Sequence, residues 1–200
     1  MSVAATLTPD EASRRDWGAA VVGAGPAGAL AARELARCGV AVLLIDRADF
    51  PRGKVCGCCL NGHALATLRT VGLNGLAERC GAVPLAELAL SAGGRPARVP
   101  LAGGVALSRE AFDAALVEAA VKAGAAFLPR TRAALDGEEQ GGRFLLLYHG
   151  AESVRVAARV VLAADGLGSA LLARAGLSAA PAAPGARIGA GVVLEPGTRV

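Results

Sequence analysis

Short apolar runs alternate with a helical pattern near the start of the chain. Residues 19–23 and 40–45 are uncharged runs of small and aliphatic side chains. Between them, residues 26–38 predict a helix that begins with a proline and ends before Gly39. Continuous apolar runs are typical of parallel strands, because helices cover both faces of such a sheet. The pattern therefore predicts a β-α-β unit.

The same alternation continues along the rest of the chain. Further helices are expected over residues 61–72, 76–80, 109–122 and 167–175. Further strands are expected as short pieces within 84–105 and over residues 126–135, 143–148, 154–163 and 188–194. Turns between the later strands are expected at Asp136-Gly137, Gly141-Gly142 and Gly150. These elements predict an α/β fold in which a parallel sheet carries a small antiparallel β-meander.

Composition excludes several classes of protein. The chain is 54% hydrophobic but only 3% aromatic, which predicts a folded domain with a core of Ala, Val and Leu. Residues 1–16 are charged and lack the apolar segment of a signal peptide. The longest uncharged run, residues 17–32, is broken by Pro26 and glycines, whereas a membrane span needs about 20 apolar residues. The net charge of +4 forms no patch, which disfavours nucleic acid and fits an anionic cofactor.

The glycines at the first strand–helix junction have the spacing of a dinucleotide-binding loop. The chain reads Gly23-Ala-Gly25-Pro26-Ala27-Gly28 at this point. The first glycine would make a tight turn, the second would let the backbone approach a pyrophosphate, and the third would allow close helix–strand packing. The helix N-terminus adds unpaired N–H groups and a partial positive charge. Gly23, Gly25, Pro26, Ala27 and Gly28 are therefore expected to contact a cofactor.

An acidic residue follows at the expected distance. Asp46 ends the second expected strand, about 20 residues beyond the glycines, where a carboxylate accepts hydrogen bonds from an adenosine ribose. An ordinary glycine-rich turn is the alternative, and the combination of strand, helix and acid disfavours it. These residues predict a dinucleotide site without distinguishing FAD from NAD.

Five more motifs follow the first glycine in order. They are Asp46-Arg47, Phe50-Pro-Arg-Gly-Lys-Val-Cys-Gly57, Thr70-Val-Gly-Leu73, Ser108-Arg-Glu-Ala-Phe-Asp-Ala-Ala-Leu116 and Ala164-Asp-Gly-Leu-Gly-Ser169. With the glycines, they resemble the FAD-dependent oxidoreductases of the para-hydroxybenzoate-hydroxylase-like superfamily, in particular the geranylgeranyl reductase and flavin monooxygenase–halogenase branch. This resemblance covers residues 23–176 and implies a Rossmann-like FAD-binding fold with FAD as cofactor.

The resemblance adds further expected cofactor contacts. In that family the segment equivalent to residues 52–57 runs along the flavin, which implies that Lys54, Cys56 and Gly57 contact it. Cys56 is a candidate flavin-side residue, and no catalytic residue is identified. Arg52 and Lys54 would offset phosphate charge or the charge of a reduced flavin. The remaining expected contacts are Arg47, Arg109, Asp165 and Gly166.

Two of these contacts have simpler alternatives. Asp165 would accept hydrogen bonds from ribityl or ribose hydroxyls or orient neighbouring N–H groups, but Asp-Gly pairs also form plain turns. Arg109 would meet a phosphate at the start of its helix, whereas a solvated arginine in a first turn is electrostatically unfavourable.

A cluster of thiols raises the question of a metal. Cys56, Cys58, Cys59 and His63 lie close together in the sequence. Structural zinc sites use two pairs of ligands, and no second pair lies nearby. Reduced free thiols are therefore favoured and no metal is expected, while a redox role for these thiols stays open. The odd total of five cysteines likewise favours a reducing cytoplasm over a disulfide framework.

The motifs divide the chain into three regions. These are an N-terminal tail at 1–16, an FAD-binding domain at 17–187 and the start of a substrate-binding sheet at 188–200. Members of the family continue with the rest of that sheet and a Gly-Asp motif, which do not occur before residue 200. We therefore expect the chain to be truncated before the substrate-binding sheet is complete.

The resemblance implies an FAD-dependent oxidoreductase in which NAD(P)H reduces the flavin. The reduced flavin would act on a small hydrophobic organic substrate, and the segment around Lys54 and Cys56 favours a geranylgeranyl-reductase-like enzyme. An FAD-dependent monooxygenase or halogenase, a non-catalytic dinucleotide-binding fragment and an NAD-only dehydrogenase are the alternatives. Membrane contact is expected only for an isoprenoid substrate, and the oligomeric state is not indicated.

Overall fold

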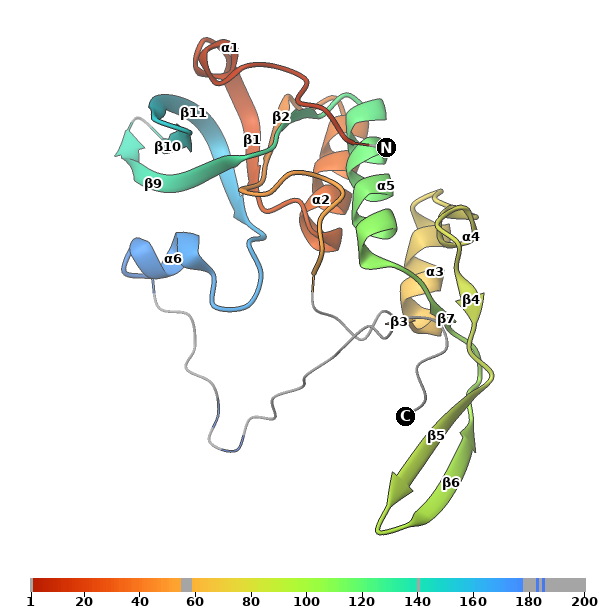
Figure 1. Cartoon of the computed structure of the whole chain (residues 1–200). Coiled ribbons are helices and arrows are strands. Elements are labelled where there is room, and N and C mark those ends of the chain that lie inside the picture. Colours follow the sequence, from red (N-terminus) through yellow and green to blue (C-terminus); the bar gives the residue numbers. More distant parts are fainter. Residues whose placement is uncertain (1, 55–58, 140, 178–182, 184, 186–200) are drawn as a thin grey trace. The chain divides into compact units, whose positions relative to one another are not determined.

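The computed structural model describes residues 2–54, 59–139, 141–177, 183 and 185, in two compact units (Figure 1). The first unit comprises Met1–Arg52 and Glu110–Ala180, and the second comprises Gly53–Arg109 and Pro181–Val200. Among the described residues, no helix is long and apolar enough to cross a membrane.

The first unit is built on a six-stranded sheet in the order β8-β2-β1-β11-β10-β9. Its strands are β1 (Asp16–Val22), β2 (Val42–Ile45), β8 (Ala126–Leu128), β9 (Thr131–Glu139), β10 (Gly142–His149) and β11 (Glu152–Ala163). Neighbours from β8 to β11 are parallel, whereas β11, β10 and β9 pair antiparallel. The predicted α/β fold with a parallel sheet and an antiparallel meander is confirmed.

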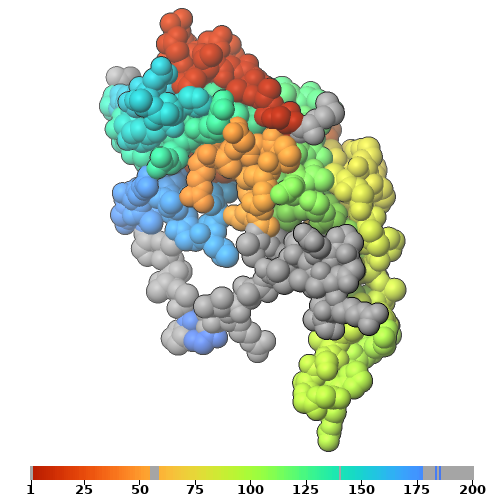
Figure 2. All heavy atoms as spheres, in the orientation of Figure 1, coloured from red at the N-terminus to blue at the C-terminus, as the bar shows by residue number. Residues whose placement is uncertain are grey.

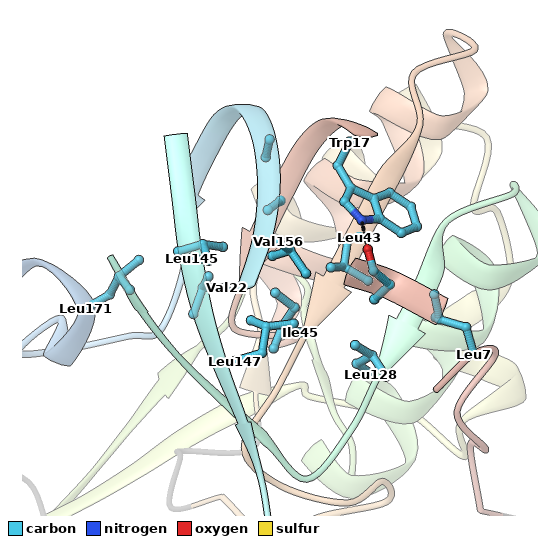
Figure 3. Packing of buried hydrophobic residues seen from close by; sticks show 13 residues of the cluster. Leu7, Trp17, Val22, Leu43, Ile45, Leu128, Leu145, Leu147, Val156 and Leu171 are labelled. Atoms are coloured by element: carbon cyan, nitrogen blue, oxygen red, sulfur yellow. Dashed lines mark hydrogen bonds between the residues drawn. The ribbon is translucent and has the colours of Figure 1, made fainter. Parts of the chain in front are cut away.

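Strands β1 and β2 are buried on both faces, as their apolar runs predict. Val22 and Ile45 belong to the cluster that also contains Leu145 and Leu147 of β10, so the meander folds over this face (Figure 3). Successive side chains of a strand point to opposite faces. Leu44 therefore faces the other side, where α2 (Pro26–Arg37) packs against β1 and β2. Helix α5 (Arg109–Lys122) begins and ends at the predicted residues.

The N-terminal segment contains a short helix, α1 (Pro9–Ser13). Its first turn is closed by a capping box, in which the Thr8 hydroxyl accepts from Glu11 N and the Glu11 carboxylate accepts from Thr8 N. Trp17 is 4% exposed and donates from Nε1 to the Ala12 carbonyl at 2.9 Å (Figure 3). Leu7 and Ala12 thereby join the core of the first unit.

Two predictions about the later strands are wrong. Residues 126–135 form two strands, β8 and β9, at opposite edges of the sheet, because the chain breaks at Pro129 and Arg130. Proline has no N–H to donate, and Arg130 has a φ of 51°. The second error concerns Asp136-Gly137, which lies inside β9 where the register with β10 shifts, so that the extra residue forms a bulge instead of a turn.

The second unit contains short helices and small sheets. Its elements are β3 (Cys59–Leu60), α3 (Gly62–Thr70), α4 (Leu76–Arg79), β4 (Val83–Pro84), β5 (Glu87–Ala92), β6 (Arg95–Pro100) and β7 (Val105–Ala106). Strands β3, β7 and β4 form one sheet, and β5 pairs with β6 in an isolated ribbon, yellow-green in Figure 2. Every residue of β5 and β6 is exposed. The expected strand at 188–194 lies outside the described residues.

Candidate cofactor-binding site

Three parallel strands of the first unit end side by side, and each is followed by a residue predicted to contact the cofactor. Val22 is in register with Ile45 of β2 and with Ala163 of β11. Gly23 therefore lies between Asp46 and the Ala164–Asp165 segment. Ligands of open α/β sheets bind at the carboxyl ends of the strands. The fold thus brings three motifs that are far apart in the sequence to one such edge.

Two of the three fingerprint glycines are required by close packing. Gly23 has a φ of 105°, and a Cβ there would lie 2.3 Å from the Ala164 carbonyl oxygen. A Cβ on Gly28 would lie 1.8 Å from the Gly23 carbonyl oxygen. Both distances are far below ordinary contact, so side chains at these positions would separate α2 from the sheet edge.

The second glycine is different, because it lies beside open space. Gly25 is the N-cap of α2, with an extended backbone and no side-chain hydrogen bond to the helix. Among the described residues, a Cβ on Gly25 would have one neighbour within 4 Å, the Nη2 atom of Arg52 at 3.7 Å. Pro26 and Ala27 begin the helix after it. The first-turn N–H groups thus have no side-chain cap, as a pyrophosphate-binding N-terminus requires. The arrangement fits the phosphates of a dinucleotide.

Asp46 lies at this edge and holds the neighbouring loops. It is 8% exposed, and its Oδ2 accepts from Ala24 N at 2.8 Å while Oδ1 accepts from Ala48 N at 2.9 Å. A carboxylate offers about four lone-pair sites, so two remain for ribose hydroxyls. Arg47, the next residue, is exposed. The segment that follows β2 lies at the molecular surface (orange in Figure 2).

The contacts predicted from the sequence do not include a buried ionic cluster next to Asp46. Arg52 Nη2 lies 3.7 Å from Asp46 Oδ2 and 3.6 Å from Asp113 Oδ2. Asp113 is fully buried in α5. The only sequence signal was the position of both residues within family motifs, because an acid inside an amphipathic helix is otherwise expected at the surface.

Asp165 uses both carboxylate oxygens within its own loop. Oδ1 accepts from the Ser169 hydroxyl at 2.8 Å, and Oδ2 accepts from Leu171 N at 2.9 Å. These bonds hold the start of α6 (Ala170–Arg174). Of the two interactions expected for Asp165, the structure shows the orientation of a neighbouring N–H group. Gly166 follows with a φ of 91°, a conformation that favours glycine.

The remaining predicted contacts belong to the second unit or lie outside the described residues. Lys54 is exposed, and Arg109 is half-buried at the start of α5. Cys56 and Gly57, together with Cys58, lie outside the described residues. Within the described part of the chain, no three His, Cys, Asp or Glu side chains are grouped as metal ligands.

Comparison with known proteins identifies the family. The FAD binding domain family matches residues 16–193. A digeranylgeranylglycerophospholipid reductase of Methanopyrus kandleri is 37% identical over 162 residues, which cover 78% of this chain and 39% of the relative. A menaquinone reductase of Mycobacterium tuberculosis is 57% identical over 53 residues, or 26% of this chain and 13% of the relative. The chain thus spans at most about two fifths of these relatives.

Solved structures share the fold. A geranylgeranyl bacteriochlorophyll reductase-like protein from Thermoplasma acidophilum has a TM-score of 0.69 and 26% identity, over 82% of this chain and 42% of that protein. The flavin-dependent halogenase CmlS has a TM-score of 0.70 and 24% identity, over 82% of this chain and 32% of the halogenase. Because the FAD binding domain family matches residues 16–193, and the glycine cradle and Asp46 meet at one sheet edge, the chain belongs to the FAD-binding-domain family of FAD-dependent oxidoreductases.

Proposed function

We propose that the first unit binds the ADP portion of FAD at the carboxyl edge of β2, β1 and β11. The observation that carries this proposal is the open N-terminus of α2 at Gly25, next to the carboxylate of Asp46. The N–H groups of the first turn would hold the pyrophosphate, and Asp46 would accept from the adenosine ribose. Gly23 and Gly28 would contribute by letting the backbone come close.

Further contacts are proposed from the family resemblance. Arg47, Lys54, Cys56, Gly57, Arg109 and Gly166 would complete the environment of the cofactor. Asp165 would act through the loop that it orders, because its oxygens already accept from Ser169 and Leu171. A flavin supplies hydride transfer when it is bound, and the protein supplies orientation and electrostatics.

We further propose that the chain is part of an NAD(P)H-dependent reductase of a hydrophobic isoprenoid substrate. The support is the 37% identity to a digeranylgeranylglycerophospholipid reductase over most of this chain. The short match to a menaquinone reductase points to the same substrate class. A monooxygenase or halogenase is the second candidate. It has weaker support, because the similarity to the halogenase CmlS is a similarity of fold alone.

Flavin binding and turnover can be measured separately. The purified chain should take up FAD, with flavin absorbance remaining after gel filtration. NADH or NADPH oxidation with FAD present then separates an enzyme from a binding module, since tight FAD binding without turnover supports the module. Reduction of a geranylgeranyl lipid would appear as a mass increase of about 2 Da per double bond, because a hydride and a proton add to each alkene. A colourless chain that does not take up FAD contradicts the proposal.

A further inference from the structure

Arg52 is held in a defined position by groups from three segments of the first unit. Its side chain is 16% exposed, and its guanidinium lies 4.9 Å from the centre of the Phe50 ring. That ring packs edge-on against Phe127, with centroids 5.7 Å apart, and both rings are buried. The stacking surface under Arg52 is therefore part of the core. Asp46 and Asp113 provide the other two contacts.

Both carboxylates lie within ion-pair distance of the same cation. Asp46 is nearly buried and Asp113 is completely buried, and a buried carboxylate is costly unless it is paired or hydrogen-bonded. Arg52 Nη2 is within ion-pair distance of both, at 3.7 Å and 3.6 Å. One guanidinium thus links the end of β2 to α5. Arg52 and Asp113 are 61 positions apart in the sequence.

The guanidinium also borders the cofactor loop. The same Nη2 atom lies 3.7 Å from the position that a Cβ on Gly25 would take. Asp46 accepts from Ala24 N, the residue before Gly25. The Nε atom of Arg52 is buried and has no hydrogen-bond partner among the described residues, so within them this arginine is held mainly by its charge and by the Phe50 ring. Its position therefore depends on both carboxylates.

We infer that Arg52 is a positioning residue for FAD binding that acts through Asp46. It neutralises and orients the carboxylate that would meet the adenosine ribose, and it ties the loop of residues 50–52 to α5 through Asp113. This inference rests on the proposed FAD site. A direct phosphate ligand would act independently of Asp46, whereas a positioning residue acts only while the Asp46 carboxylate is present.

A double-mutant cycle distinguishes these roles. FAD affinity is measured by calorimetry for the chain and for Arg52→Gln, Asp46→Asn and the double variant. Arg52→Gln should weaken FAD binding about tenfold or more, as expected for groups in direct contact. In the Asp46→Asn background the same change should have less than about a threefold effect. Equal losses in both backgrounds, or unchanged affinity in folded Arg52→Gln, would overturn the inference.

A matched control comes from Arg155 in the same unit. Arg155 also stacks on a phenylalanine, at 3.8 Å from the Phe144 ring, and pairs with Asp136 and Glu139. Arg155→Gln should leave FAD affinity unchanged, because these partners are on β9. Arg52→Lys keeps the charge and should recover part of the FAD affinity that Arg52→Gln loses. A merely structural role predicts no such recovery when the two variants are equally stable.

The stability of the apo chain provides a readout that does not need FAD. Arg52→Gln and Asp113→Asn should be non-additive in urea unfolding followed by tryptophan fluorescence, because each removes the same contact. Additive effects would overturn the proposed link to α5. Failure of the unmodified chain to bind FAD would overturn the proposed function and, with it, the role of Arg52 in binding. The unfolding cycle would still test the contact between Arg52 and Asp113. Should Arg52→Gln not fold, Arg52→Met, which keeps a long side chain without the charge, replaces it in both cycles.

Discussion

Replacing fingerprint glycines one at a time should separate folding from cofactor binding. In Gly28→Ala the new Cβ would lie 1.8 Å from the Gly23 carbonyl oxygen, whereas ordinary contact begins at 3.4 Å, so backbone must move by about 1.6 Å. Overpacking costs about 1–3 kcal/mol or more, and alanine regains about 1 kcal/mol of helix propensity. Because the obstacle is backbone, the cost should lie at the upper end of this range, and we expect a net destabilisation of about 2 kcal/mol.

Gly25→Ala should have the opposite outcome. Its φ of −72° suits alanine, and its Cβ would meet only Arg52 Nη2, at 3.7 Å. The free energy of unfolding should change by less than about 1 kcal/mol. FAD affinity should fall at least about tenfold, because the methyl group occupies the space through which a pyrophosphate would approach the backbone.

Urea unfolding measures the free energy of unfolding of each variant. Trp17 fluorescence follows it, since this single tryptophan is buried in the first unit. Calorimetric titration measures the FAD affinity of each variant. Gly62→Ala is the control: it begins α3, and its Cβ would have no neighbour within 4 Å among the described residues. FAD affinity should not change, and stability should rise by no more than about 1 kcal/mol of helix propensity. A Gly28→Ala variant as stable as the unmodified chain, or a Gly25→Ala variant with unchanged FAD affinity, refutes the reasoning.

Two further predictions concern loops of the first unit. Asp165→Ala removes the acceptors of Ser169 Oγ and Leu171 N, so α6 should lose about 1 kcal/mol per bond and its amides should exchange faster; unchanged exchange would contradict this role. The hydrogen bonds from the Thr8 backbone and hydroxyl lower the pKa of Glu11. Its contribution to stability is therefore present above its unfolded pKa and lost as pH falls through its lower, folded pKa. The stability difference between the chain and Glu11→Gln should accordingly shrink on acidification, and a constant difference would exclude this linkage.

The sequence predicted the features that depend on local pattern. The β-α-β unit, the helix at residues 109–122 and the glycine cradle follow from periodicity and from the steric needs of a tight turn. The split of residues 126–135 was missed, although Pro129 stands inside this segment and disfavours one continuous strand. The left-handed Arg130 that follows it completes the break, and sequence pattern alone does not reveal that backbone conformation.

The ionic cluster at the site was also beyond local reasoning. Asp113 lies in a helix, where an acid is ordinarily expected at the surface. It is buried beside Arg52, which stacks on Phe50, and that ring packs on Phe127; these contacts join segments that are far apart in the sequence. Asp165 shows a related limit, since the sequence allowed both a ligand contact and a loop contact, and the observed bonds are with its own loop.

The most direct test of the account is a parallel titration of the chain with FAD and with FMN, repeated with Asp46→Asn. Asp136→Asn, which removes an exposed carboxylate paired with Arg155, is the matched control. FAD should bind more tightly than FMN, which lacks the AMP part, and of the two variants only Asp46→Asn should diminish this preference. Equal affinities for FAD and FMN, or an undiminished preference in Asp46→Asn, would contradict it.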